Sequence, residues 1–109
     1  MNDSFVLRGT PASSGTATGK VRIARTISDL DELDDGEILV VEHSNPSWTV
    51  GMLKAAAIIA SSGGIICHAA LVAREMGIPA VVALDSALEA LHTGQVITVN
   101  GDDGTVCDG

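Results

Sequence analysis

The distribution of hydrophobic and polar residues along the chain predicts short strands that alternate with short helices. Predominantly apolar runs at 37–41, 56–60 and 80–84 are typical of strands whose two faces are both buried. Between residues 16 and 24, apolar and polar side chains alternate, which predicts a strand with one exposed face. Strands and helices that alternate in this way are typical of an α/β fold.

The remaining segments predict shorter elements and one loop. In chain order, they are a strand at 5–7, helices at 26–33, 46–54, 69–76 and 86–91, and a hairpin formed by 95–100 and 105–107. The segment 9–15 contains two glycines, two serines and a proline, which predicts a loop without regular structure. A length of 109 residues predicts one compact domain that spans residues 1–109.

Composition and charge narrow the classes of function. Hydrophobic residues make up 46% of the chain, but Phe5 and Trp48 are its only aromatic residues, so we expect an aliphatic core. Fourteen acidic residues against six basic ones give a net charge of −8, which argues against binding to nucleic acid or to an anionic membrane. The same acidity is equally compatible with a solubility trait that has no role in binding.

The sequence also indicates a cellular location. It contains no secretory signal peptide and no apolar run long enough to cross a bilayer. Its two cysteines, Cys67 and Cys107, lack the paired spacing of a disulfide framework or a metal site. We therefore expect a cytoplasmic protein.

A glycine-rich turn joins the strand at 56–60 to the helix at 69–76, and His68 stands at the entrance of that helix. The first N–H groups of a helix have no partner within the helix, and the helix dipole places partial positive charge there. The sequence therefore predicts an anion site beside His68. Gly63 and Gly64 let the backbone approach an anion closely because they have no Cβ. A neutral imidazole at this position is a candidate nucleophile.

The run from Gly63 to Arg74, with the letters GGIICHAALVAR, resembles the phosphorylation-site signature of the phosphoenolpyruvate-utilising enzymes. This signature lies in their mobile, swivelling phosphohistidine domain, as in phosphoenolpyruvate synthase, pyruvate phosphate dikinase and, more distantly, Enzyme I of the sugar phosphotransferase system. At the position of Ile66 the resemblance implies a hydroxyl or amide residue, which would bind the phosphoryl group. Loss of a hydrogen bond to a charged group, about 1.5–3 kcal/mol, would slow transfer roughly tenfold to a hundredfold.

Further motifs carry the resemblance along nearly the whole chain. They are the spaced residues Gly9, Pro11, Ser13, Gly15, Ala17 and Gly19, the segment Asn45-Pro46-Ser47-Trp48, and the run from Gly94 to Val106. The resemblance implies a swivelling β/β/α domain in which five to seven strands combine with three or four short helices.

The resemblance also implies which residues act at the site. His68 would be the catalytic residue that is phosphorylated. Residues that would contact phosphate are Gly63, Gly64, Cys67 and Ala69, and residues that would support the site or dock a partner are Arg74, Asn45 and Trp48. The structural alternative is that Asn45 only caps a helix and that Trp48 only packs in the core.

The function that the resemblance implies is that of a phosphoryl carrier, either as a separate subunit or as an excised domain. The domain would shuttle a phosphoryl group between an ATP-grasp nucleotide site and a second site for pyruvate, phosphoenolpyruvate or another small molecule, both on partner domains or subunits. We expect the chain to bind no cofactor or metal and to be inactive alone, with ATP and Mg²⁺ held by the partner. Two alternatives stay open: a non-catalytic binding or regulatory module with the same fold, and a metal site at Cys67 and His68.

Overall fold

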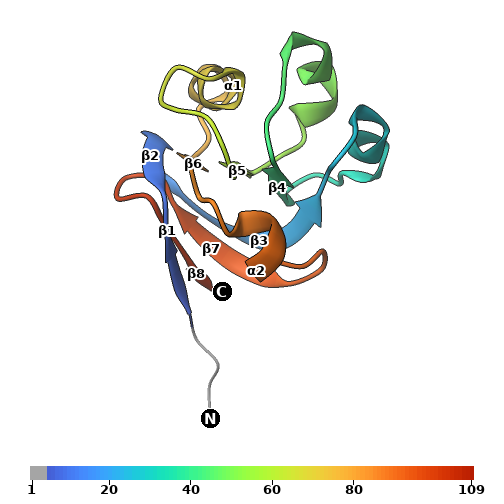
Figure 1. Cartoon of the computed structure of the whole chain (residues 1–109). Helices are drawn as coiled ribbons and strands as arrows, with labels where there is room; N and C mark the ends of the chain where they lie inside the picture. Colours follow the sequence, from blue (N-terminus) through green and yellow to red (C-terminus); the bar gives the residue numbers. More distant parts are fainter. Residues whose placement is uncertain (1–4) are drawn as a thin grey trace.

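The computed structural model describes residues 5–109, which form eight strands in one hydrogen-bonded order, β1-β8-β7-β3-β4-β5-β6-β2 (Figure 1). The strands are β1 (Val6–Arg8), β2 (Thr10–Ser13), β3 (Thr16–Ile23), β4 (Ile38–Val41), β5 (Ala57–Ala60), β6 (Ala80–Val82), β7 (Val96–Asn100) and β8 (Thr105–Asp108). The helices are the 3₁₀-helices η1 (Ile27–Glu32), η2 (Pro46–Trp48) and η3 (Val50–Met52) and the α-helices α1 (His68–Met76) and α2 (Ala87–Ala90). Within residues 5–109, no helix has the length and apolar character needed to cross a membrane.

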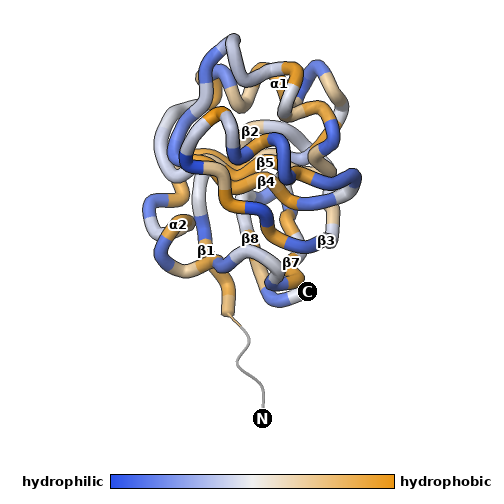
Figure 2. The backbone as a smooth tube through the Cα atoms, turned by 90° about the vertical axis from the view of Figure 1, so that its right-hand side faces the viewer, coloured by the Kyte–Doolittle hydropathy of each residue, from blue (hydrophilic) through white to orange (hydrophobic). Residues whose placement is uncertain are grey.

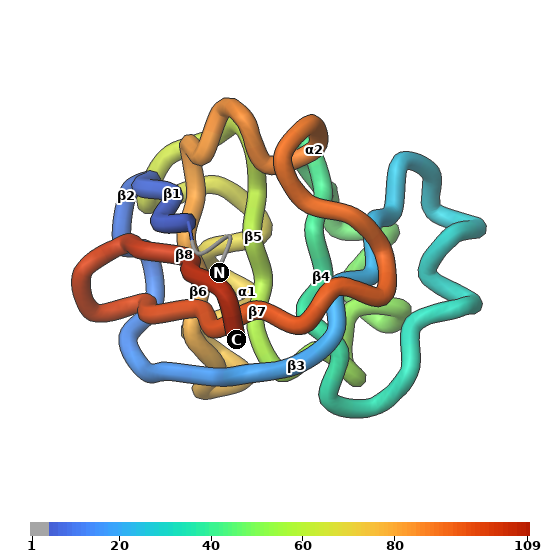
Figure 3. The backbone as a smooth tube through the Cα atoms, turned by 90° about the horizontal axis from the view of Figure 1, so that it is seen from below, coloured from blue at the N-terminus to red at the C-terminus, as the bar shows by residue number. Residues whose placement is uncertain are grey.

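Strand β3 belongs to both layers of the sheet. Its first half pairs antiparallel with β7, and its second half pairs parallel with β4. Strands β5 and β6 continue the parallel layer, and β2 lies antiparallel at its edge. The other layer is completed by β8 and β1, which are antiparallel to their neighbours. Figures 1 and 3 show β3 and β7 passing beneath the parallel strands, with α1 on the opposite side.

The parallel layer is buried on both faces because its strands are apolar throughout, and every residue of β4 and β5 is buried. On one face, Leu39 and Ile58 belong to a hydrophobic cluster that includes Ala70 of α1. On the other face, Ile38 belongs to a second cluster that includes Ile97 of β7. Figure 2 shows the hydrophobic β4 and β5 running through the interior. This arrangement confirms the expected α/β fold with β/β/α layers.

The prediction of a loop at 9–15 is wrong for Thr10–Ser13, which form β2. Pro11 is tolerated there because an edge strand leaves N–H positions without a partner in the sheet, and the register with β6 shifts between Pro11 and Ser13. Because β6 lies far along the chain, the local composition does not reveal this pairing. With β2 added to the seven expected strands, the described residues form eight, one more than the resemblance implies.

The short helix predicted at 26–33 is present as the 3₁₀-helix η1, but the single helix predicted at 46–54 is not formed. In η1, the Asp29 carboxylate accepts the backbone N–H of Thr26 (3.1 Å) and so caps the first turn. The second segment is divided into η2 and η3, and η3 packs closely on η1. A Cβ on Gly51 of η3 would lie 2.8 Å from Leu30 Cδ1, so glycine is needed for this contact.

Most other predicted boundaries agree with the structure to within one residue at either end. The exception is the apolar run at 80–84, which ends as a strand at Val82. Ala83 adopts a left-handed backbone conformation, with φ of 55°, and this conformation ends the extended segment.

Candidate functional site

His68 is the first residue of α1, and the chain reaches it through the turn that follows β5. Cys67 is the N-cap residue, and its carbonyl accepts the N–H of Leu71 (3.1 Å). The helix ends at Gly77, whose φ of 72° is the left-handed conformation expected of a C-terminal glycine. The structure therefore places His68 at the positive end of a nine-residue helix, where backbone N–H groups lack helical partners.

The turn at 61–67 is shaped by one glycine and left open at the next. Gly63 has a φ of 95°, and a Cβ there would lie 2.9 Å from Cys67 Sγ. A Cβ on Gly64 would meet nothing within 4 Å, so the space beside it is open. The Gly64 carbonyl accepts the backbone N–H of Cys67 (3.0 Å), so this N–H is not free to bind a ligand. The donor that Cys67 can still offer to a ligand is its thiol. Ala69 is buried and offers a ligand only its backbone.

Two hydroxyl groups hold the imidazole of His68, one at each nitrogen. Ser44 Oγ lies 2.8 Å from Nδ1, and Thr49 Oγ1 lies 2.9 Å from Nε2. Ser44 stands in the loop after β4, and Thr49 stands between η2 and η3. Because β4 and β5 are neighbouring parallel strands, the segments that follow them meet at the same edge of the sheet. Both polar atoms of the His68 side chain are thus within hydrogen-bond distance of a hydroxyl.

Ser44 and Thr49 were not among the residues expected at the site. Ser44 and Thr49 stand directly before and after the Asn45–Trp48 segment. Because that segment was already expected near His68, its two neighbours could have been predicted from the sequence as candidate contacts. Asn45 Oδ1 accepts the backbone N–H of Ser47 (3.0 Å) and caps η2. Trp48 is half-buried and packs against the hydrophobic cluster that includes α1. The cap and the packed indole hold the segment that presents the two hydroxyls.

Comparison with known proteins decides the family. Residues 33–104 match the sequence model of the family described as PEP-utilising enzyme, mobile domain. The chain belongs to this family. It is 42% identical over 105 residues to the probable phosphoenolpyruvate synthase of Methanothermobacter thermautotrophicus, and 45% identical over 98 residues to the uncharacterized phosphotransferase YvkC of Bacillus subtilis. These alignments cover 96% and 90% of this mobile domain but only 15% and 12% of the two relatives.

Solved structures share the fold of the mobile domain. A solution structure of Enzyme I (nEIt) matches with a TM-score of 0.62 at 29% identity, over 71% of this chain and 32% of that chain. The holo-form of aconitase X from Thermococcus kodakaraensis matches with a TM-score of 0.68 at 24% identity, over 93% of this chain and 95% of that chain. The likeness to aconitase X is one of fold alone.

Arg74 of the mobile domain lies on α1, six residues after His68, and contacts the sheet. Its Nε donates a hydrogen bond to the backbone carbonyl of Ala12 (2.7 Å). Ala12 belongs to β2, so this hydrogen bond ties α1 to the edge strand.

The chain segment that contains His68 and its two hydroxyl partners is poor in charged residues. Residues 43–73 contain no aspartate, glutamate or arginine and a single lysine, Lys54. Ile66 is 81% exposed, and Val50, beside Thr49 in the chain, is 82% exposed. Within residues 5–109, no three His, Cys, Asp or Glu side chains come together as a metal site.

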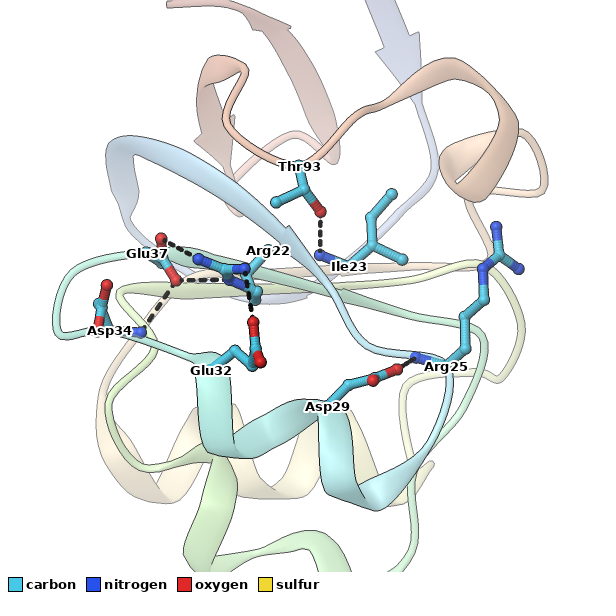
Figure 4. A network of polar contacts seen from close by, with 8 residues as sticks. All are labelled: Arg22, Ile23, Arg25, Asp29, Glu32, Asp34, Glu37 and Thr93. Carbon is cyan, nitrogen blue, oxygen red and sulfur yellow. Dashed lines mark hydrogen bonds and ion pairs between the residues drawn. The ribbon is translucent and has the colours of Figure 1, made fainter.

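A network of charged groups lies at β3 and η1 (Figure 4). Arg22 donates two hydrogen bonds to Glu37, from Nε to Oε1 (3.0 Å) and from Nη2 to Oε2 (3.2 Å). Glu37 also accepts the backbone N–H of Asp34 (2.9 Å), and Arg22 Nη1 lies 3.8 Å from Glu32. The hydrogen bonds from Arg22 hold the pKa of Glu37 below its usual value, and the same contact raises the pKa of Arg22.

Proposed function

We propose that this mobile domain is a phosphoryl carrier that is transiently phosphorylated on His68. It passes the phosphoryl group between a nucleotide-binding site of the ATP-grasp type and a second site, for pyruvate, phosphoenolpyruvate or another small molecule, on partner domains or subunits. The observation that carries the proposal is the position of His68, the first residue of α1, inside the glycine-rich motif of a mobile-domain family. Relatives named phosphoenolpyruvate synthase and phosphotransferase, of which this chain spans a small part, support it.

The proposed chemistry is nucleophilic attack by the imidazole. Nε2 is the ring nitrogen farther from the main chain, so a partner can reach a phosphoryl group bound to it. The Nε2 lone pair attacks phosphorus of a phosphoanhydride or an enol phosphate, and the N–P bond forms. The bond from phosphorus to the leaving oxygen breaks, and the leaving group departs with that electron pair. Transfer to the acceptor repeats the exchange in reverse.

The phosphoryl oxygens are stabilised by the N–H groups of the first turn of α1 and by the open backbone at Gly63 and Gly64. ATP and Mg²⁺ belong to the partner in this proposal, and the chain alone turns over nothing. Cys67 and Cys107 carry free thiols, as proteins of a reducing cytoplasm do, and we place the carrier there.

A second candidate function is a binding or regulatory module that keeps the fold without turnover. Two observations favour it. Ile66 stands where the family signature has a hydroxyl or amide residue, and its side chain is exposed. Both nitrogens of His68 are already engaged by hydroxyl groups.

Labelling from a radioactive phosphoryl donor distinguishes the two functions. The protein is incubated with labelled ATP or phosphoenolpyruvate in a cell extract that contains phosphoenolpyruvate synthase activity, as wild type, His68→Ala and the control His43→Ala. His43 is exposed. We expect acid-labile, base-stable label on wild type and His43→Ala and none on His68→Ala. Label that survives in His68→Ala contradicts the carrier, and no label on any of the three favours the non-catalytic module.

A further inference from the structure

The hydroxyls of Ser44 and Thr49 at the His68 ring have different roles. The assignment of these roles rests on the proposed carrier function. We infer that Ser44 fixes His68 in the tautomer with its proton on Nδ1, and that Thr49 binds the phosphoryl group once it stands on Nε2. Thr49 thereby supplies the hydroxyl that the family signature leads one to expect at position 66. Ser44 is a positioning residue, whereas Thr49 touches the transferred group.

The assignment of Ser44 follows from the chemistry of neutral imidazole, which has one N–H donor and one lone pair. If Nε2 is the attacking atom, its lone pair must be available and the proton must reside on Nδ1. Ser44 Oγ lies 2.8 Å from Nδ1 and has lone pairs that accept that N–H. After attack, the ring carries the phosphoryl group on Nε2 and the proton on Nδ1, and the same oxygen stabilises its positive charge.

The assignment of Thr49 follows from its place at the other nitrogen. Its hydroxyl lies 2.9 Å from Nε2 and donates to the lone pair in the resting state. Phosphorus takes that lone pair during transfer, so the hydroxyl must leave it. The oxygens on the same phosphorus atom are then the nearest acceptors, and rotation of the Thr49 side chain brings the O–H to one of them. No atom is added or lost, because one hydrogen bond replaces another.

The backbone of Thr49 keeps the hydroxyl in this place. Its N–H donates to the Pro46 carbonyl (3.3 Å), and its own carbonyl accepts the N–H of Met52 (3.1 Å). Met52 is fully buried, so η3 is anchored in the core. Ile66, by contrast, is 81% exposed on the turn and has no polar atom in its side chain. In this chain, the hydroxyl that the proposal requires is therefore presented by the segment next to the histidine turn and not by the turn itself.

The role of Ser44 is tested by ring nitrogen chemical shifts of ¹⁵N-histidine-labelled protein. We expect wild type to show a protonated Nδ1 and an unprotonated Nε2 at neutral pH, and Ser44→Ala to shift toward the opposite tautomer. Ser47→Ala is the matched control, because its hydroxyl bonds Asn45 on the same segment and not the ring. Ring shifts that are the same in Ser44→Ala and wild type, or a wild-type proton on Nε2, overturn the assignment.

The role of Thr49 is tested by phosphorylation with potassium phosphoramidate, which needs no partner protein. A background of His43→Ala and His92→Ala leaves His68 as the only histidine, since the chain has three. We expect Thr49→Val to slow formation of phosphohistidine about tenfold to a hundredfold, as for loss of a hydrogen bond to a charged group, and Thr49→Ser to retain it. Thr18→Val, whose hydroxyl bonds Thr98 elsewhere, is the control.

An unchanged rate in Thr49→Val overturns the role of Thr49, and so does an equal loss in Thr18→Val. Both measurements are independent of the carrier function. If labelling from ATP and phosphoenolpyruvate fails while the ring shifts and the phosphoramidate rates behave as expected, the carrier function is lost and the roles of the two hydroxyls stand.

Discussion

The region around His68 and the region around Arg22 hold their polar groups in opposite ways. Arg22 and Glu37 are fully charged and satisfy each other through two hydrogen bonds, with Glu32 and Asp34 beside them. His68 is held by neutral hydroxyls in a stretch with one lysine and no acidic residue. The charged groups around Arg22 bind one another, whereas the region around His68 presents the first N–H groups of α1, which have no partner within the helix.

Neither charge nor pocket shape locates the candidate site at His68. Perturbed pKa values often mark active sites, but those of Glu37 and Arg22 arise from an internal ion pair. An open hollow of about 320 Å³ also lies at the charged region, lined by Arg22, Arg25, Asp29 and Glu32 among others. A search for functional sites based on perturbed pKa values or on pocket volume would therefore select the region around Arg22 and not His68. The site is recognised by backbone geometry and by two neutral hydrogen bonds.

The largest change in stability is expected from breaking the ion pair. Glu37→Ala leaves the guanidinium of Arg22 without its main partner and the N–H of Asp34 without its acceptor. The Glu37 side chain is only 12% exposed, so water replaces these contacts poorly. We expect a loss of about 2–3 kcal/mol in the free energy of unfolding, measured by urea denaturation.

The control for this change is Glu32→Ala. Glu32 is 73% exposed and lies 3.8 Å from Arg22, so its removal is expected to cost under about 0.5 kcal/mol. Equal losses in the two variants would show that the network acts through surface charge and not through the bidentate pair. We expect neither variant to alter phosphorylation of His68 in the folded protein, because the ion pair and the His68 region are independent of each other.

A smaller effect of the same pair is expected with pH. Because Arg22 lowers the pKa of Glu37 in the folded state, ionised Glu37 stabilises the fold above the unfolded value of about 4.3. That contribution is lost as pH falls below 4.3 and through the lowered folded pKa. Denaturation between pH 3 and pH 7 should therefore show a shallower acid decline for Glu37→Gln than for wild type. If the free energy of unfolding falls equally with acid in wild type and in Glu37→Gln, Glu37 is not the source of the acid sensitivity.

The two regions also differ in how far the sequence predicts them. The strand, the glycine turn, His68 at the helix start and Gly77 at its end follow from neighbouring residues, and the structure agrees with each. Ser44 and Thr49 reach His68 across 24 and 19 residues, through the pairing of β4 with β5. Hydrophobic periodicity and secondary-structure propensity depend on residues close together in the chain, so they do not predict such long-range contacts.

The same limit explains β2 and the ionic network. Thr10–Ser13 forms a strand because β6 offers an edge, although its composition is that of a loop. The alternation at 16–24 places Arg22 on the exposed face of a strand, and nothing in that pattern indicates that its partner is Glu37, at the start of the run at 37–41. The resemblance to the family supplied the β/β/α layers, but it implied at most seven strands and so did not reveal β2 either.

The smallest expected effect concerns the neutral region, where Ile66→Thr restores the residue type of the family signature. If Thr49 already supplies the hydroxyl, Ile66→Thr should change the phosphoramidate rate of wild type less than about twofold. In the Thr49→Val background, Ile66→Thr should raise the phosphoramidate rate by a larger factor, because the new hydroxyl at position 66 then replaces the one lost at position 49.

The four rates of this cycle, for wild type, each single variant and the double variant, decide between shared and separate roles. The control is Ile65→Thr, which adds a hydroxyl one residue earlier on the turn and should recover nothing. An equal gain from Ile66→Thr in both backgrounds means that the two hydroxyls act independently, and then Thr49 does not stand in for the missing one. A gain confined to Thr49→Val means that a neutral hydroxyl at the phosphoryl group is what the site requires, whichever segment presents it.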